Sequence, residues 1–138
     1  MIKLYDYILS GSCYKVRLML NILNVEYEAV PVDFYPGLEH KKPDFLALNP
    51  LGQLPVLTDD ELILRDAQSI LLYLVSKYDA ANTWFPEDAA TRGQVAMWTA
   101  FGGDEIMAAS AARLHDVLNY PFDIDQQRKS AHAAFLIL

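Results

Sequence analysis

One stretch near the middle of the chain, Asn49-Pro50-Leu51-Gly52-Gln53-Leu54-Pro55-Val56-Leu57, constrains the fold more than any other. Pro50 and Gly52 predict a tight turn, and the apolar residues after them predict the start of a strand. Proline cannot donate a hydrogen bond to a neighbouring strand, so Pro55 belongs at the first residue of a strand or on a sheet edge. A cis bond before Pro55 would leave the backbone N–H and C=O of Leu54 facing outward, open to an extended peptide. An ordinary trans bond is the alternative.

The composition limits the classes of protein to which the chain can belong. It has 138 residues, of which 53% are hydrophobic, and its one cysteine is Cys13. We therefore expect a packed core, no internal disulfide and a reducing compartment. The net charge of -7 disfavours nucleic acid and anionic membrane surfaces as partners. The N-terminus does not resemble a signal peptide, and no apolar run approaches the ~18 residues that span a bilayer, so we expect a cytoplasmic protein.

The first half of the chain predicts alternating strands and helices. Strands are expected at Ile2–Ile8 and Tyr27–Val32, on either side of a helix over Cys13–Leu23 whose apolar residues recur with helical spacing. A helix between two strands predicts a crossover that joins a parallel pair. A short helix, a hairpin and a third helix are expected at 43–48, 56–64 and 67–78. The order βαβ-α-ββα is the thioredoxin-like arrangement, an α/β fold.

The second half of the chain predicts helices alone. The segment 79–88 has no periodicity and is expected to link a domain at 1–78 to a second domain at 89–138. The helical pattern of the second domain is interrupted at Gly102-Gly103, where each glycine costs about 1 kcal/mol relative to alanine, so we expect a kink or the close approach of another backbone. A further helix begins at Asp123 and runs into an apolar end. Such an end predicts that the all-α domain is incomplete.

Three motifs occur in a fixed order along the chain: Ser10-x-x-Cys13-x-Lys15-Val16-Arg17, the Asn49–Leu57 stretch, and Asp66-x-x-x-Ile70-x-x-Tyr73-Leu74. In this order they resemble the serine-dependent glutathione transferases of the phi, theta and zeta classes. The resemblance is strong over 1–78 and diffuse after that. It implies that the Leu54–Pro55 bond is cis and that Leu54 pairs with the cysteinyl backbone of glutathione. Family members continue for several more helices, so the resemblance also implies a truncated all-α domain.

Ser10 matches the position of the family's catalytic serine. At a free pKa near 8.5, only a few per cent of the glutathione thiol is ionised at pH 7. Lowering that pKa by about two units needs roughly 2.7 kcal/mol, which a hydroxyl donor and a helix N-terminus can supply together. We therefore expect Ser10 to donate a hydrogen bond to the thiolate. In the alternatives, Ser10 only caps the helix, Ser12 is the capping or donating residue, or Cys13 forms a mixed disulfide with glutathione.

The resemblance assigns both ends of glutathione to residues of this chain. The glycine carboxylate would meet three of them: His40, Lys41 and Gln53. A solvated basic loop is the alternative for the first two. The γ-glutamyl ammonium would meet Asp66, and its carboxylate would meet the start of the following helix. The family has serine next, where this chain has Ala67; a lost hydrogen bond to a charged group costs about 1.5–3 kcal/mol, which Gln68 would have to compensate.

The electrophile is expected to lie against the helical domain, at Met107, Ser110, Ala111 and Leu114, although core packing explains these positions as well. The resemblance implies a glutathione transferase of the detoxification type, with glutathione as co-substrate, no metal or other cofactor, and a homodimeric state. A glutathione-dependent isomerase or peroxidase would use the same site. From another class, a non-catalytic binding or assembly module is the alternative, which Ala67 and the short helical domain favour.

Overall fold

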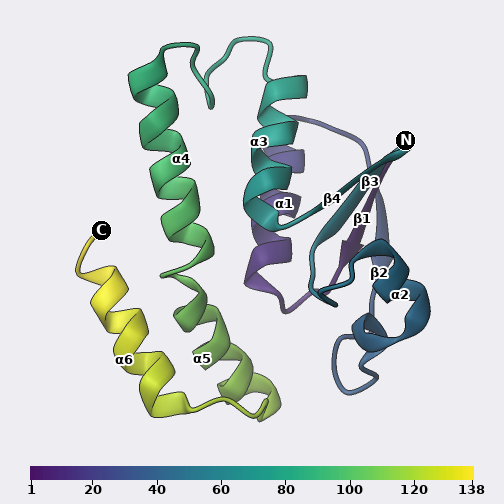
Figure 1. Ribbon diagram of the computed structural model, residues 1–138, viewed down its shortest axis with the longest axis vertical. Helices are drawn as coiled ribbons and strands as arrows, with labels where there is room; N and C mark the ends of the chain where they lie inside the picture. The colour runs from purple at the N-terminus through teal and green to yellow at the C-terminus, as the bar shows by residue number, and fades with distance from the viewer. The chain divides into compact units, whose positions relative to one another are not determined.

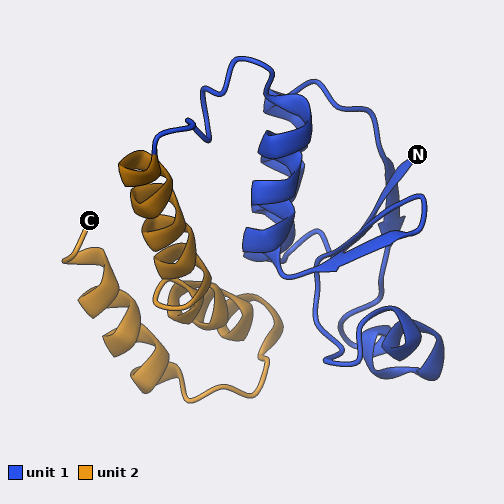
Figure 2. Cartoon of the chain, turned by 45° about the horizontal axis from the view of Figure 1, so that its top comes forward, with its two compact units in different colours: residues 1–88 blue, residues 89–138 orange.

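The computed structural model describes all 138 residues, and the chain divides into two compact units, Met1–Asp88 and Ala89–Leu138 (Figure 2). The first unit contains a sheet with helices, and the second contains helices alone (Figure 1). The segment 79–88 contains no helix or strand. None of the helices has both the length and the apolar character needed to cross a membrane.

The first unit has the element order that the sequence predicts. Its elements are β1 (Ile2–Asp6), α1 (Gly11–Ile22), β2 (Glu28–Pro31), the 3-10 helix η1 (Glu39–Lys41), α2 (Pro43–Leu48), β3 (Val56–Asp59), β4 (Leu62–Arg65) and α3 (Ala67–Tyr78). The strands lie in the order β2-β1-β3-β4, with β1 parallel to β2 and β3 antiparallel to both of its neighbours. The βαβ-α-ββα prediction is confirmed.

The core of this unit follows from the alternation of side chains along the strands. Ile2 and Leu4 of β1 are buried in one cluster with residues of α1 and α3, among them Leu20 and Ile70. Tyr5 follows Leu4 in β1 and points to the opposite face, where it packs in a second cluster with residues of β3 and α2. Because the two clusters lie on opposite faces of the sheet, β1 and β3 are held from both sides. The loop that follows β1 and the turn that precedes β3 are therefore anchored to rigid strands.

Two X–Pro bonds in the first unit are cis: Leu54–Pro55 and Tyr35–Pro36. The first confirms what the motif implied, and the second was not predicted. Asp66 has a positive φ of 79°, and Gly52 has one of 57°. Asp66 is itself a predicted site residue, and Gly52 lies next to another, Gln53.

The second unit contains α4 (Ala89–Gly103), α5 (Met107–Leu118) and α6 (Ile124–Phe135). The interruption expected at Gly102-Gly103 is present, but it is the end of α4 rather than a kink within one helix, and α5 begins only at Met107. At Gly102 no other group lies within 4 Å of the place a Cβ would occupy, so no close backbone approach explains that glycine. Asp123 is the N-cap of α6, because its Oδ1 accepts from the N–H of Gln126 at 3.1 Å. The helix predicted to begin at Asp123 is therefore present.

Candidate functional site

Ser10 lies where the loop after β1 becomes α1. Its backbone is extended (φ -75°, ψ 122°), and its Oγ accepts from the N–H of Cys13 at 3.2 Å, so Ser10 is the N-cap of α1. Ser12 lies inside the first turn, and the suggestion that Ser12 caps the helix is therefore wrong. A hydroxyl oxygen that accepts a hydrogen bond still has its own O–H to donate. The capping role of Ser10 is thus compatible with donation to a thiolate.

Cys13 is fully buried in the first turn of α1. Burial raises the pKa of its thiol to about 11, although hydrogen bonds involving the Ser10 side chain and the Tyr7 backbone partly oppose this. A thiol with this pKa is protonated at neutral pH, and the thiolate is the reactive form. The structure therefore argues against Cys13 as a partner in a mixed disulfide.

The turn before β3 is shaped by Asn49, a residue to which sequence reasoning gave no role of its own. Asn49 is buried; its Nδ2 donates to the carbonyl of Gln53 at 2.8 Å and its Oδ1 accepts from the N–H of Leu51 at 3.1 Å. Gly52 closes the turn with a positive φ, and a Cβ there would lie 2.8 Å from the carbonyl oxygen of His40. An asparagine between a helix and a proline was the available signal for such a turn.

The turn leaves an open backbone segment at Leu54. Strand β3 begins at Val56, which pairs with Tyr5, and the backbone N–H and C=O of Leu54 have no hydrogen-bond partner. Pro55 is buried and Gln53 is exposed. An extended peptide that reached this segment would find the paired donor and acceptor of a strand.

The predicted basic pair separates into two different environments. His40 is only 1% exposed, and its ring stacks on that of Phe34 with centroids 4.1 Å apart. Burial and the charge of Lys41 lower the pKa of His40, so its ring is neutral at pH 7, and its Nδ1 has no hydrogen-bond partner. The alternative of a solvated basic loop is therefore wrong for His40, which belongs to η1 and is buried.

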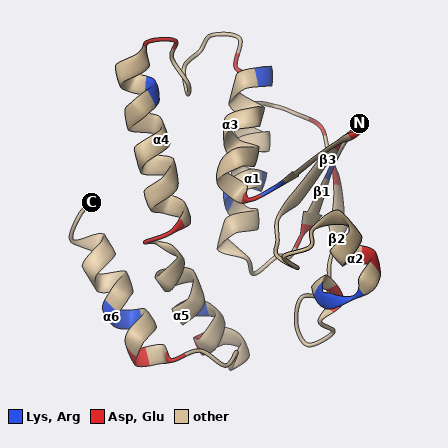
Figure 3. Cartoon of the chain, in the orientation of Figure 1, with Lys and Arg blue, Asp and Glu red and all other residues tan.

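Lys41 remains exposed and reaches the turn before β3. Its Nζ donates to the carbonyl oxygens of Gly52 at 3.1 Å and Leu51 at 3.5 Å. The structure thus brings Lys41 beside the turn that carries Gln53. Acidic residues accompany the basic ones, since Glu39 lies in η1 and Asp44 in α2, and Figure 3 shows both signs of charge around these two elements.

Asp66 and Ala67 form the start of α3. The Oδ1 of Asp66 accepts from the N–H of Ser69 at 2.9 Å and from its hydroxyl at 3.2 Å, which makes Asp66 the N-cap. A positive φ at a non-glycine residue is an unfavourable conformation of the kind found at functional sites. Ala67 is 3% exposed and belongs to the core cluster, and its backbone N–H has no hydrogen-bond partner. The methyl group therefore fills the core while the N–H stays available.

Lys15 links the starts of α1 and α3 electrostatically, a role that sequence reasoning did not assign. Its ammonium is half-buried, and this burial lowers its pKa, whereas the negative charge of Asp66 opposes the shift. The positive charge of Lys15 in α1 is thus favoured by the carboxylate that caps α3. This arrangement suits the recognition of a ligand that carries both an ammonium and a carboxylate.

The four positions expected to meet an electrophile lie in the second unit, on one face of α5: Met107, Ser110, Ala111 and Leu114. The opposite face of α5 packs on α6 and lines a pocket of about 360 Å³ with it, using Ala109, Ala112 and Asp116 among others. Packing between these two helices therefore does not account for the four positions.

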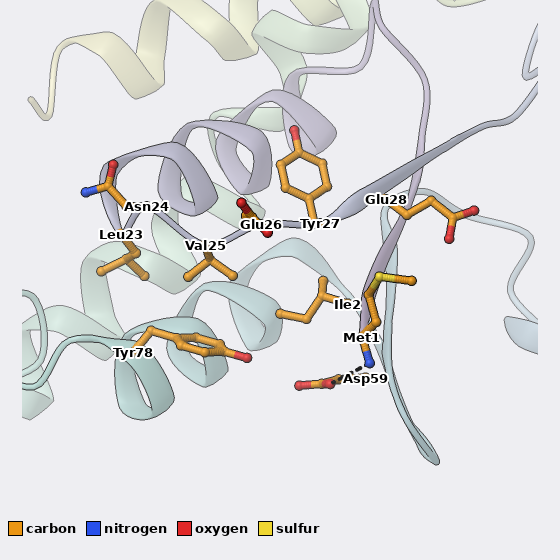
Figure 4. A pocket seen from close by; sticks show the side chains of 10 residues that line it. All are labelled: Met1, Ile2, Leu23, Asn24, Val25, Glu26, Tyr27, Glu28, Asp59 and Tyr78. Atoms are coloured by element: carbon orange, nitrogen blue, oxygen red, sulfur yellow. Dashed lines mark ion pairs between the residues drawn. The ribbon is translucent and has the colours of Figure 1, made fainter.

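A pocket of about 1070 Å³ lies elsewhere on the first unit, between the start of β1, the segment 23–28 and Tyr78 at the end of α3 (Figure 4). None of the predicted site residues lines it. Its acidic rim is already partly paired, because Asp59 interacts with Lys77 and Glu28 with Lys3. It is a separate feature from the loops described above.

Comparisons with known proteins agree with the resemblance. A family model described as "Glutathione S-transferase, N-terminal domain" matches residues 4–82. Glutathione S-transferase 3 of Zea mays is 39% identical over 97 residues, which cover 70% of this chain and 43% of that protein. Maleylacetoacetate isomerase of Pseudomonas aeruginosa is 41% identical over 78 residues, covering 55% of this chain and 37% of that protein.

The crystal structure of a diazinon-metabolizing glutathione S-transferase of the silkworm, Bombyx mori, superimposes with a TM-score of 0.83 at 27% identity. The superposition covers 100% of this chain and 65% of that one. This chain spans less than half the length of the two curated relatives named above.

Proposed function

The chain belongs to the glutathione S-transferase family, and from that membership we propose that it binds glutathione and activates its thiol for conjugation to a hydrophobic electrophile. One observation carries this proposal: Ser10 caps α1 with its oxygen accepting from the N–H of Cys13, so its own O–H remains a donor that can turn toward a thiolate placed at the helix start. A hydroxyl donor and a helix N-terminus then act on the same sulfur.

We propose that glutathione lies extended along the open segment at Leu54. Its cysteinyl backbone would pair with the N–H and C=O of Leu54, which have no partner in the protein, as an added strand would. Pro55, buried behind this segment, holds the turn in place. Backbone pairing of this kind fixes the register of the tripeptide and hence the position of its thiol.

The two ends of glutathione meet different chemistry. At the glycine end, Lys41 supplies the charge for the carboxylate, while Gln53 and the neutral ring of His40 contribute hydrogen bonds at most. At the γ-glutamyl end, Asp66 attracts the ammonium and the backbone N–H of Ala67 donates to the carboxylate. Without the family's serine hydroxyl at Ala67, we expect glutathione affinity to be roughly tenfold lower than with it.

For the electrophile, Met107, Ser110, Ala111 and Leu114 of α5 are the proposed contacts, and the thiolate would attack it. Ser10 stabilises the thiolate by a hydrogen bond and is not itself a nucleophile. Placing the two reactants side by side supplies much of the remaining rate. The detoxification role, the homodimeric state and the cytoplasmic location belong to this proposal as well.

An isomerase is the second candidate function. It is favoured by the 41% identity to maleylacetoacetate isomerase, a match as strong per residue as that to the transferase of Zea mays. Such an enzyme would use the same glutathione thiolate, added to a double bond and then released. A non-catalytic binding module would keep the fold without thiolate formation, and Ala67 is the observation that favours it.

A titration of glutathione followed by thiolate absorbance in the ultraviolet tests the proposal. Wild type is expected to show bound thiolate near neutral pH, and Ser10→Ala is expected to bind glutathione with the thiol pKa back near its free value of about 8.5. Ser12→Ala is the matched control and should behave as wild type. Thiolate in Ser10→Ala but not in Ser12→Ala would transfer the role to Ser12. No binding at millimolar glutathione would reject the transferase and isomerase functions together.

A further inference from the structure

Arg17, on the second turn of α1, fastens the loop that carries Ser10. Its Nη1 donates to Oδ1 of Asp6, the last residue of β1, and its Nη2 donates to the carbonyl oxygen of Ile8 at 3.2 Å. A guanidinium presents its donors in a rigid planar fork, so one side chain holds two acceptors in a fixed geometry. The end of the strand and the middle of the loop are thereby tied to the helix.

This pair is shielded from water more than an ordinary surface ion pair. The side chains of Arg17 and Asp6 are 16% and 12% exposed. A partly buried ion pair loses less of its attraction to solvent screening than a pair on the surface. The chain has a surface counterpart in the second unit, where Arg128 binds Asp116 at 3.0 Å with both side chains more than half exposed.

The Arg17–Asp6 pair continues directly into the contacts of Ser10. Asp6 acts on the thiol of Cys13 both by charge and by a hydrogen bond, and the N–H of Cys13 donates to Oγ of Ser10. The N–H of Ser10 in turn donates to the carbonyl of Tyr7 at 2.9 Å, within the loop that Arg17 holds. Two of the hydrogen bonds that orient Ser10, those with Tyr7 and Cys13, are therefore made to residues that the Arg17–Asp6 pair adjoins.

We propose that Arg17, acting with Asp6, is a positioning residue: its fork sets the β1–α1 loop so that the Ser10 hydroxyl meets the glutathione thiolate, and it balances the nearby Asp6 carboxylate. The inference rests on the proposed function, because it needs a thiolate at Ser10. Arg17 itself touches neither glutathione nor the electrophile in this account. Replacing Arg17 should therefore change the pKa of the bound glutathione thiol and leave the affinity for glutathione nearly unchanged.

Four variants separate positioning from folding. Arg17→Met removes the fork and leaves Asp6 unpaired. Asp6→Asn with Arg17→Met removes the fork without leaving a buried charge, which is the costly part of breaking such a pair. Arg17→Lys keeps the charge but not the fork. Arg128→Met breaks the surface pair of the second unit and serves as the control.

The readouts are the melting temperature, the pH dependence of bound-thiolate absorbance, and kcat and KM for glutathione. The double variant is expected to recover much of the melting temperature lost in Arg17→Met. It should still lose kcat by roughly 10- to 100-fold with little change in KM, as misplacement by about 1 Å does. Its bound thiol should titrate close to the free value of about 8.5. Arg17→Lys should fall between, and Arg128→Met should match wild type.

The inference would be overturned if the double variant had the same thiol pKa and kcat as wild type. It would also be overturned if the variants lost only melting temperature, with thiol pKa and kcat unchanged. Amide exchange provides a check without activity: the loop amides at 7–10 should exchange faster in the double variant than in wild type. Unchanged exchange there would contradict the positioning role. If the wild-type protein forms no bound thiolate, the proposed function is wrong. That result is obtained before any Arg17 variant is made, so it is distinct from a failure of the inference about Arg17.

Discussion

The two units of the chain bury their apolar residues in opposite ways. In the first unit, large side chains such as Leu4, Leu57 and Leu74 are fully buried around the sheet. In the second unit, the only buried apolar residues are two alanines, Ala131 and Ala134, while Trp98, Phe135 and other large side chains are exposed. The first unit therefore has a hydrophobic core of its own, and the second has helices with little shared interior.

Because of this difference, the proposed binding of glutathione and the proposed binding of the electrophile are expected to differ in rigidity. The groups proposed to bind glutathione stand on loops fixed by a core and by local hydrogen bonds, among them those of Asn49 and Ser10. The groups proposed to meet the electrophile stand on one face of α5, which no core supports. Glutathione recognition is therefore expected to be preorganised, and electrophile recognition is expected to be adaptable.

Truncating core leucines should give the largest contrast between the units. Leu57→Ala or Leu74→Ala is expected to lower the free energy of unfolding by about 2–5 kcal/mol, because each leaves a cavity beside the sheet. Leu136→Ala, where the side chain is 89% exposed, should change it by less than about 0.5 kcal/mol. Urea denaturation of the full chain measures both. Equal losses in the two units would contradict the description of the second unit as lacking a core.

Ala67→Ser tests whether the core and the site compete at one residue. The added hydroxyl is expected to tighten glutathione binding about tenfold by donating to the γ-glutamyl carboxylate. It should also lower the stability of the free protein by about 1–3 kcal/mol, because Ala67 is buried. Calorimetric titration and thermal melting report the two effects.

The control for this substitution is Ala131→Ser, at a buried alanine of the second unit. It should cost stability without any gain in affinity for glutathione. An unchanged affinity in Ala67→Ser would show that the family's serine hydroxyl has no counterpart in this site.

Acid should weaken the first unit through Asp59. Hydrogen bonds from Lys77 at 2.5 Å and Tyr73 at 2.6 Å lower the pKa of this buried carboxyl below its ordinary value of 3.8. A carboxyl whose pKa is lower in the folded than in the unfolded state contributes its full stabilisation at pH values above the unfolded-state pKa. That contribution is lost as the pH falls through the folded-state pKa. Stability should therefore drop below about pH 3.8, and Asp59→Asn should flatten that part of the profile.

Asp116→Asn provides the comparison, because Asp116 pairs with Arg128 on the surface of the second unit. Exposed pairs contribute little, so this variant should keep the wild-type acid profile. Denaturation measured from neutral pH downward distinguishes the two variants. If Asp59→Asn leaves the dependence of stability on pH unaltered, Asp59 is not the source of the acid sensitivity.

The smallest effect concerns Cys13. Its burial and its pKa of about 11 predict very slow reaction with a disulfide reagent at pH 8 in the folded protein and rapid reaction after unfolding. Labelling rates with and without denaturant measure the difference. Rapid labelling of the folded chain would mean that the core of the first unit opens easily.

Much of the first unit was predictable because its signals are local. Apolar periodicity located α1 and α3, and the proline and glycine motif located the turn before β3. The cis bond at Leu54–Pro55 followed from the resemblance of the motif rather than from any propensity.

What escaped prediction depends on contacts between distant residues. A His-Lys-Lys run indicates an exposed basic loop, yet His40 is buried because Phe34 stacks on it and the turn at Gly52 covers its backbone. The fork of Arg17 was equally invisible, since only the folded chain brings Asp6 and the carbonyl of Ile8 to it. In the second unit, two glycines predicted an interruption but could not show that α4 ends there.

Hydrogen exchange of the full chain with and without saturating glutathione tests the central claim most directly. The account predicts that glutathione slows exchange at the amides of Leu54 and Ala67, whose N–H groups have no partner in the free protein, and leaves α5 and α6 unchanged. Binding with no protection at these two amides, or with protection confined to the second unit, would contradict the assignment of glutathione recognition to a preorganised first unit.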